Sequence, residues 1–492
     1  MRENAQKPCT QVMKMYKIPS KQMAFEDFNQ PVGMQMNPAN RWVKKAELIS
    51  WDEIETEYAK LFKGFKGHIA KPARMALGAL LIQIEYGYSD EETAEQIKEN
   101  PYLQYFCGLP GYEYKAPFDP SAMVRFRKRL TPEKLEAINE QVILKMEAKR
   151  KAEEDHKDDD KPQTPSNKGT LIVDATCAPS QIKYPRDVEL LNEAREKLET
   201  IVDVLHTPED GKKPRMYRQN ARKQYLSIAR SKKNNAKKIR KAVRQQLQYI
   251  SRNQKIVAIL RQDGRPLAEK YQRQLEVIAK LYEQQKYMYD HKVHSVSQKI
   301  ENLRQPYLRP IVRGKAKAPT EFGAKLDISV VDGLVRLEQQ SFEAYNESEL
   351  LQMEVEHYYA RYGRYPERVL ADKIYRNRGN LAYCKEKGIR LSGPALGRPK
   401  KDAVRDRKTE YEDICDRVEV ERAFSLAKRR FGLGKIRTYL KETTQTVIAL
   451  SILALDLSKL QCAQILNLVI NIIEAFWRSV QWNASQKIAF AQ

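Results

Sequence analysis

Two aspartates occupy similar places in the sequence, each at the end of a predicted β-strand. The apolar run LIVDA reaches Asp174, and the run RVLADK reaches Asp372. Catalytic groups in open α/β sheets gather at the carboxyl ends of strands, where the loops leave the sheet. Either aspartate alone is more often a residue of a strand-end turn. Two of them in one sheet suit two-metal phosphoryl chemistry, which needs carboxylates that converge within a few ångströms.

A third acid is expected from the long helix predicted at residues 411–432. Four acidic residues fall inside it: Asp413, Asp416, Glu419 and Glu421. Arg417, Glu421 and Lys428 recur at helical spacing and therefore share one face of the helix. Glu421 then lies between two cations that can bind phosphates beside a metal. Glu419 points about 160° away from Glu421 and is expected to face solvent.

The spacing around Glu421 resembles the signature of bacterial insertion-sequence DDE transposases. In their Y-R-E-K group the third acid lies in the pattern Y-x2-R-x3-E-x6-K. Arg417, Glu421 and Lys428 match the R, E and K of this pattern without a gap, whereas Ile414 occupies the Tyr position and Tyr411 lies one turn earlier. The segments DATCAPSQIKYPRD, ADKIYRNRGN and VERAFSLAKRR are also similar to this family.

The resemblance implies a catalytic domain of the RNase H-like fold. In this family Asp174, Asp372 and Glu421 would be the catalytic residues and would hold two Mg²⁺ ions, for which Mn²⁺ can substitute. The implied reactions are hydrolysis of phosphodiesters at transposon ends and strand transfer into target DNA. Carboxylate oxygens suit such hard cations. The implied partners are double-stranded DNA, as terminal repeats and as target, and a second copy of the chain in the assembled complex.

Two other functions stay open from the sequence. A non-catalytic DNA-binding protein derived from a transposase would keep the basic surfaces without cleaving DNA. A structure-specific nuclease of the same fold would cleave DNA without joining it. The three acids, with Arg417 and Lys428 in register, favour a working active site over the first alternative. The helical region before the acids, where residues 51–130 resemble the InsH-like N-terminal domain of these transposases, favours recognition of particular DNA ends.

Several groups of cations are candidate DNA contacts. Lys435 and Arg437 extend the basic face past the helix of Glu421. Four more cations cluster on a predicted helix near the N-terminus, where a solvated basic face is an equal alternative: Arg125, Arg127, Lys128 and Arg129. The stretch 211–262 contains 17 Lys and Arg residues and no Asp or Glu. Such a block can neutralise several backbone phosphates, with an affinity that falls steeply with salt.

Other acids have simpler explanations. Asp187, in the loop after the first strand, either orients a metal-bound water or is an ordinary loop aspartate. The run at residues 158–160 lies in a polar stretch and is interpreted as a solvated loop. Asp332 precedes Gly333 between two apolar runs, a pair typical of a two-residue hairpin turn.

Composition limits the class of protein. The chain has 492 residues, of which 41% are hydrophobic and 31% charged, which excludes an integral membrane protein. A net charge of +24 indicates a polyanionic partner, either nucleic acid or an anionic surface. Six scattered cysteines without a C-x-x-C pair predict a reducing, cytoplasmic setting. The resemblance to bacterial transposases implies association with the nucleoid. The apolar segment from Thr446, interrupted by Asp456 and Lys459, fits a buried helical pair better than a membrane span.

The expected architecture is α/β, a mixed sheet flanked by helices, with an α-helical N-terminal domain and a helical insertion after the first strand. The predicted parts are an N-terminal arm (1–50), a helical DNA-binding domain (51–146), a linker (147–168), the catalytic domain (169–187 and 306–445), the basic helical insertion (188–305) and C-terminal helices (446–492).

Overall fold

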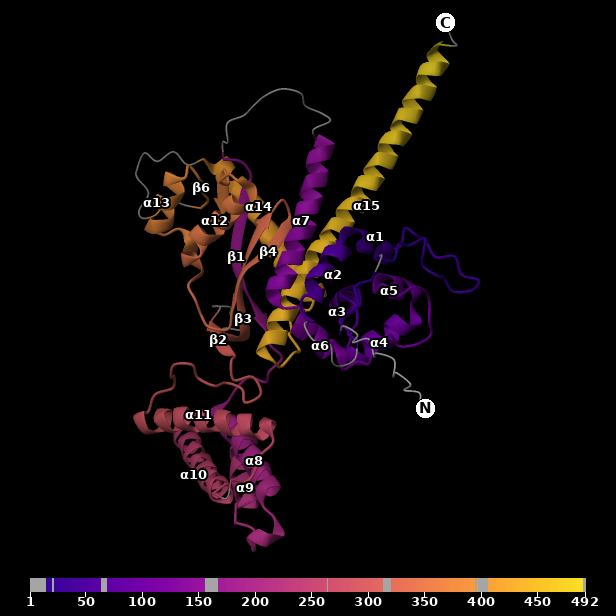
Figure 1. Cartoon of the computed structure of the whole chain (residues 1–492). Coiled ribbons are helices and arrows are strands. Elements are labelled where there is room, and N and C mark those ends of the chain that lie inside the picture. The colour runs from indigo at the N-terminus through magenta and orange to yellow at the C-terminus, as the bar shows by residue number, and fades with distance from the viewer. Residues whose placement is uncertain are drawn as a thin grey trace, which may run out of the picture.

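The computed structural model describes most of the chain (Figure 1). The described residues are 15–19, 22–62, 69–154, 167–262, 264–312, 320–393, 396 and 406–489. The acidic run at residues 158–160 lies outside them. The chain begins with the helices of the N-terminal region and then forms the first strand of a mixed sheet. A separate helical bundle is inserted before the remaining strands and helices of the sheet region, and one long helix follows at the C-terminal side.

In its described residues, the N-terminal region contains seven helices: α1 (Arg41–Leu48), α2 (Trp51–Ala59), α3 (Ala73–Tyr86), α4 (Asp90–Glu99), α5 (Pro101–Phe106), α6 (Ala122–Arg129) and α7 (Pro132–Glu154). Pro72 directly precedes α3, where its missing N–H costs no helical hydrogen bond. Ser89 caps α4 by accepting from the Glu92 amide at 3.1 Å. Helix α1 begins inside the expected arm, and Tyr16 is buried in the same core. Much of the arm therefore packs onto the helices.

The sheet has six strands: β1 (Thr170–Pro179), β2 (Arg309–Val312), β3 (Thr320–Val331), β4 (Leu334–Ser341), β5 (Arg368–Leu370) and β6 (Arg390–Leu391). Their order is β2-β3-β1-β5-β6, and β4 also pairs with β3. Pairing is antiparallel among β1 to β4 and parallel from β1 through β5 to β6. The expected fold class, an RNase H-like mixed sheet with an α-helical N-terminal region, is confirmed.

The turn between β3 and β4 follows from its two residues. Asp332 and Gly333 have φ angles of 50° and 81°, and Val331 pairs with Leu334 across them. Positive φ at both central positions matches the right-handed twist of the strands, and Asp-Gly tolerates it best. The predicted hairpin is confirmed.

Helices η2 (Glu347–Glu349), α12 (Leu351–Tyr362), η3 (Lys373–Tyr375), α13 (Arg378–Glu386) and α14 (Arg407–Arg430) connect and cover the later strands. The apolar C-terminal segment forms one helix, α15 (Lys441–Ala489), and not the expected pair. Its part Lys441–Gln464 is long and apolar enough to cross a membrane, but 83% of its most apolar window is buried inside this structure. Burial of that kind is typical of a core helix, and α15 contacts α3, α7 and β4.

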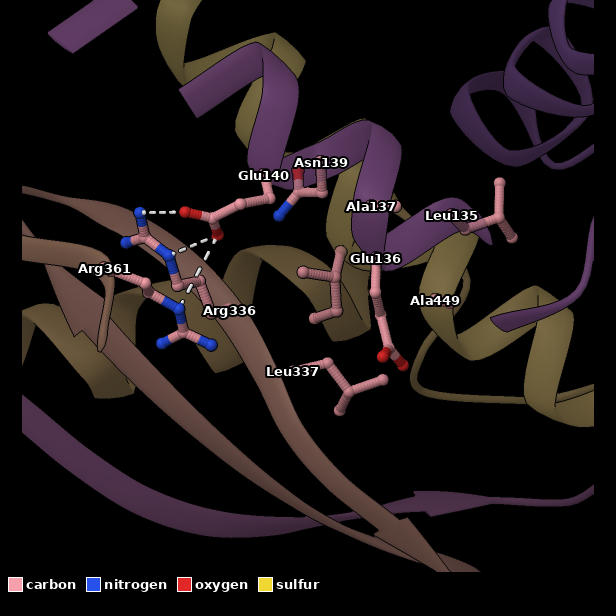
Figure 2. A pocket seen from close by; sticks show the side chains of 10 residues that line it. Leu135, Glu136, Ala137, Asn139, Glu140, Arg336, Leu337, Arg361 and Ala449 are labelled. Atoms are coloured by element: carbon pink, nitrogen blue, oxygen red, sulfur yellow. Dashed lines mark hydrogen bonds and ion pairs between the residues drawn. The ribbon is translucent and has the colours of Figure 1, made fainter. Parts of the chain in front are cut away.

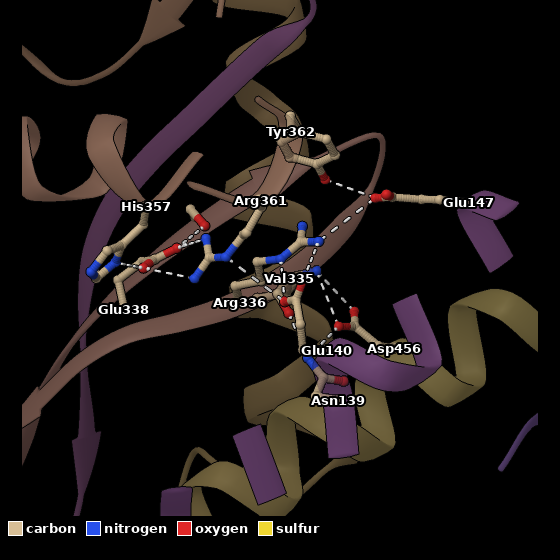
Figure 3. A network of polar contacts seen from close by, with 11 residues as sticks. Asn139, Glu140, Glu147, Val335, Arg336, Glu338, His357, Arg361, Tyr362 and Asp456 are labelled. Atoms are coloured by element: carbon tan, nitrogen blue, oxygen red, sulfur yellow. Dashed lines mark hydrogen bonds and ion pairs between the residues drawn. The ribbon is translucent and has the colours of Figure 1, made fainter. Parts of the chain in front are cut away.

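Polar contacts fasten β4 to α7 and α15 (Figure 3). Arg336 of β4 is 3% exposed and donates to Glu140 of α7 at 2.7 and 3.1 Å. Asp456 of α15 is fully buried and accepts from the Val335 amide at 3.0 Å and from Asn139 at 3.1 Å. Beside these contacts lies a cavity of about 210 Å³ that α7, β4 and α15 enclose (Figure 2). The N-terminal helices are thus held to the sheet by buried charges as well as by apolar packing.

The insertion is a bundle of α8 (Asp187–Leu205), η1 (Pro208–Asp210), α9 (Arg218–Ala229), α10 (Ala236–Leu260) and α11 (Glu269–His291). It has its own apolar core, which includes Leu191, Ile250 and Leu281. In Figure 1 the bundle lies below the sheet, beyond the carboxyl end of β1. Asp187 binds Lys299 at 3.1 Å and Gln285 at 2.9 Å, which ties the first turn of α8 to the end of the insertion.

Candidate active site

Asp174 in β1 and Asp372 just after β5 lie at equivalent positions relative to the parallel pairing of these two strands. Ile172 is paired with Leu370, and each aspartate lies two residues beyond its member of that pair. Asp372 follows β5 and caps η3, with its Oδ1 accepting from the Lys373 amide at 2.7 Å. Asp174 does not end its strand as expected, because β1 continues to pair with β3 as far as Pro179.

The surroundings of Asp174 disfavour its charge. Its side chain is 21% exposed, and burial raises its pKa to about 6. The Ala175 amide, 2.8 Å from Oδ1, and the Arg417 guanidinium lower this pKa, whereas nearby Asp372 raises it further. A partly buried carboxylate beside another carboxylate gains stability from any cation that approaches both.

Helix α14 links Glu421 to Asp174 through one arginine. Val420, buried on this helix, packs it into the core, and α14 contacts β1 and β5. Arg417 Nη1 lies 3.7 Å from Asp174 Oδ2, and Nη2 donates to Glu421 Oε1 at 3.3 Å. The predicted face of α14 therefore meets β1 at Asp174, and one guanidinium links the first acid to the third.

Three other acids of α14 are engaged elsewhere. Asp413 binds Arg390 at 2.6 and 2.7 Å, and Asp416 binds Arg368 at 2.6 Å. Glu419 was expected to face solvent, but it is 34% exposed and binds Lys459 of α15 at 2.9 Å. These three pairs fix α14 against β5, β6 and α15, which leaves Glu421 as the acid of this group that shares a cation with Asp174.

The cations predicted around Glu421 differ in exposure. Lys428 is half-buried on α14, and Lys435 is exposed in the segment that follows. Arg437 is also exposed and donates to the Gly87 carbonyl at 3.4 Å. At the signature position without a tyrosine, Ile414 is 65% exposed. The face next to the acids is therefore basic and open to solvent.

The four cations predicted on α6 differ in their exposure and in their contacts. Arg127 is 7% exposed and binds Asp90 and, at 3.1 Å, Gln83. Its guanidinium holds α6 to α3 and α4, so the expectation of a DNA contact at this position is not supported. The Arg129 guanidinium lies 4.8 Å from the centre of the Phe62 ring. Arg125 and Lys128 are exposed and can reach a ligand.

A buried acidic pair behind β1 was missed in the sequence. Asp327 of β3, opposite Ala175, and Glu354 of α12 are both fully buried. Burial raises the pKa of Asp327 to about 7 and that of Glu354 well above its usual value. Tyr375 donates to Asp327 at 3.3 Å. No pattern could have revealed this pair, because α12 brings Glu354 to β3 only in the folded chain.

The acids suit a divalent cation by chemistry, but they do not enclose one. Asp174, Asp372 and Glu421 supply only hard oxygen donors, the type that Mg²⁺ and Mn²⁺ bind. In the described part of the chain, no group of three or more His, Cys, Asp or Glu side chains is close enough to hold a metal ion. Arg417 contacts two of the three acids, so a guanidinium occupies part of the space that a bridging ion would need.

Comparison with known proteins identifies two regions. A family model described as "Transposase DDE domain" matches residues 369–458, and one described as "Transposase domain (DUF772)" matches residues 32–129. A protein from Rhizobium meliloti, "Uncharacterized protein ORF8 in nfe locus", is 30% identical over 169 residues, which cover 33% of this chain and 73% of that protein. No solved structure matches the chain.

Proposed function

The chain belongs to the insertion-sequence DDE transposases, and on that premise we propose that Asp174, Asp372 and Glu421 are its catalytic acids. The reaction is hydrolysis of a phosphodiester at each transposon end, followed by transfer of the freed 3′-hydroxyl to target DNA. One observation carries this proposal: Arg417 contacts both Asp174 and Glu421, and Asp372, just after the adjoining strand β5, is close enough to raise the pKa of Asp174.

The three carboxylates would hold two Mg²⁺ or Mn²⁺ ions. When bound, such ions lower the pKa of an attacking water or hydroxyl and stabilise the leaving oxygen. The chain itself supplies rigid placement, because Asp174 lies in β1, Asp372 directly follows its paired strand β5, and Glu421 lies on a helix fixed by three ion pairs. Arg417, once released from the acids, is placed to bind a phosphate beside the scissile bond.

The partners in this proposal are double-stranded DNA and a second copy of the chain. The region matched as a transposase domain, residues 32–129, recognises transposon ends, with Arg125 and Lys128 as exposed contacts. Lys428, Lys435 and Arg437 contact the DNA near the acids. Joining two ends requires two active sites, so the assembled complex contains at least a dimer. The reaction takes place in the cytoplasm, at the nucleoid.

The test is incubation of the purified chain with DNA that contains the sequences flanking its gene, in Mg²⁺ or Mn²⁺. Nicks at the element boundaries together with joined products support the proposal. Nicks without joining identify a nuclease of the same fold. Binding without either product identifies a DNA-binding protein that has lost catalysis.

A further inference from the structure

The insertion divides its charges unevenly between its helices. On α8 and the segment after it, cations have acidic partners: Lys197 binds Glu193 at 3.2 Å, and Lys213 binds Asp203 at 2.6 Å. Helix α10 contains no Asp or Glu in its 25 residues. Within the described part of the chain, its exposed cations form no ion pair with a carboxylate. Positive charge is therefore neutralised by nearby acids on α8 and the segment after it, and is left without such acids on α10.

The unbalanced cations of α10 form one line, which we name the α10 stripe. Its members are Lys237, Lys241, Arg244, Arg252 and Lys255, and all five are exposed. They recur every three or four residues, apart from a gap that exposed Gln248 fills at the same spacing. Ala242, Ile250 and Val257 are buried on the opposite face. At 1.5 Å per residue, the stripe is about 27 Å long.

The stripe works against the stability of its own helix. Lys237 and Lys241, four residues apart, repel one another, as do other neighbours one turn apart. An ordinary solvated helix face offsets such repulsion with acids at the same spacing, and α10 has none. A ligand with regularly spaced negative charge would relieve the repulsion along the whole line.

A groove between α10 and α11 runs beside the second half of the stripe. Its volume is about 840 Å³, and Arg244, Arg252 and Lys255 line it together with Lys286 of α11. Tyrosine and glutamine side chains form much of the remaining lining: Tyr217, Gln224, Gln245, Gln248, Tyr249, Tyr282 and Tyr289. Asp290 is the one acid in the lining, against four cations, and Leu247, Ser251, Ile256 and Ile259 line the groove as well. The Arg252 guanidinium lies 4.6 Å from the centre of the Tyr217 ring, which restricts its motion. Cations, amides and hydroxyls of this kind contact phosphates and sugars and do not select a base sequence.

We propose that the α10 stripe and its groove bind the phosphate backbone of double-stranded DNA without reading its sequence. The inference rests on the proposed function, because DNA held at the acids is the polyanion closest to the insertion. Strand β1 carries Asp174 and leads at Pro179 into α8, so the bundle lies beyond the same end of the sheet. A length of about 27 Å corresponds to roughly eight base pairs.

The test compares two triple variants of the full-length chain. The stripe variant is Arg244→Gln, Arg252→Gln, Lys255→Gln. The control is Lys197→Gln, Lys213→Gln, Arg273→Gln, which removes three positive charges from the same bundle, each already paired with an acid. Affinity for a duplex of arbitrary sequence is measured by fluorescence anisotropy against KCl concentration, without divalent cations.

We expect the slope of log K against log salt to become shallower by about 3 in the stripe variant and by less than about 1 in the control. The proposal is overturned if the stripe variant keeps the wild-type salt slope. It is also overturned if the salt slope of the control variant changes as much as that of the stripe variant. Replacement of Arg244 and Arg252 by Lys keeps the charges and is expected to keep the slope, and circular dichroism checks that all variants are folded. Because no cleavage occurs without divalent cations, this result stands apart from the nicking assay, and either proposal can fail alone.

Discussion

Arg417 Nη1 lies 3.7 Å from Asp174 Oδ2, and the same guanidinium donates to Glu421 at 3.3 Å. A cation that belongs to the chain thus sits among carboxylates that would hold metal ions. It lowers the pKa of Asp174 and so keeps that partly buried acid closer to its charged form. If the acids hold metal ions as proposed, Arg417 would compete with them for the two oxygens that it contacts.

Replacement of Arg417 by Gln is therefore expected to strengthen metal binding in the absence of DNA. Removing a positive charge a few ångströms from the site favours a divalent cation, and a gain of about tenfold in affinity corresponds to about 1.4 kcal/mol. Isothermal titration with Mn²⁺ measures it. The control is Arg422→Gln on the same helix, whose side chain is 74% exposed and which is expected to leave Mn²⁺ affinity unchanged. Equal affinities of the Arg417 variant and the wild type would contradict the competition.

Neutral substitutions of the three acids should separate cleavage from binding. For Asp174→Asn, Asp372→Asn and Glu421→Gln we expect the cleavage rate to fall on the order of 100-fold or more, since each removes a charged ligand. DNA affinity is expected to stay within about twofold of the wild type, because no cation is lost. Nicking of end DNA and anisotropy on the same duplex measure the two effects.

The matched control for the acids is Asp416→Asn, on the same helix as Glu421. Asp416 binds Arg368 and is 46% exposed, so its charge serves the packing of α14 and not the site. We expect cleavage to remain within a few-fold of the wild type. If Asp416→Asn abolished cleavage while Glu421→Gln did not, Asp416 would replace Glu421 as the third acid.

The strand and helix patterns in the sequence were enough to predict the mixed sheet and the shared face of α14. They misplaced Asp174 at a strand end, since the residues after it are small or polar and do not look like a strand. Ala178 is nonetheless buried, because β3 pairs with β1 through Pro179. The hydrophobic pattern of a segment indicates only how that segment is buried. The length of β1 also depends on how far its partner strand β3 pairs with it.

The sequence prediction also failed for charged residues that are buried in the folded chain. Asp456 and Lys459 were interpreted as breaks in an apolar run, yet α15 is continuous through both. Asp456 accepts from the Val335 amide, and Lys459 donates to the Gly333 carbonyl at 2.6 Å. Arg127 was likewise predicted to be an exposed cation, but its side chain is buried and binds Asp90. Each of these partners lies far away in sequence, so no spacing rule could have identified it.

Loss of Arg336 is expected to destabilise the fold strongly. This side chain is 3% exposed and binds Glu140 of α7 at 2.7 Å, so Arg336→Met would leave this partly buried carboxylate with only the more distant Arg361, at 3.9 Å. Removing one member of a buried ion pair costs about 3–5 kcal/mol. Urea denaturation measures the change, and Arg273→Met, at an exposed pair on α11, is expected to cost less than about 1 kcal/mol. Similar losses for both variants would contradict an anchoring role for Arg336.

Replacement of Asp456 by Asn is expected to change how stability depends on pH. Burial raises the pKa of Asp456 to about 7, so the folded state binds a proton that the unfolded chain releases near pH 4. The stability from this proton is full below about pH 4 and is lost as the pH rises through about 7. Asn keeps an acceptor for the Val335 amide and carries no charge. The free energy of unfolding of Asp456→Asn should therefore increase relative to that of the wild type as the pH rises, by up to a few kcal/mol.

Thermal unfolding of Asp456→Asn and the wild type at pH 5 and pH 8 tests this expectation. The difference in melting temperature should favour the variant more at pH 8 than at pH 5. Glu95→Gln, at an exposed position of α4, is the control and is expected to follow the wild type at both pH values. A variant that is less stable than the wild type by the same amount at both would show that Asp456 is buried as a carboxylate. In that case Lys459 and Arg336, the nearby cations that lower its pKa, outweigh the cost of burial.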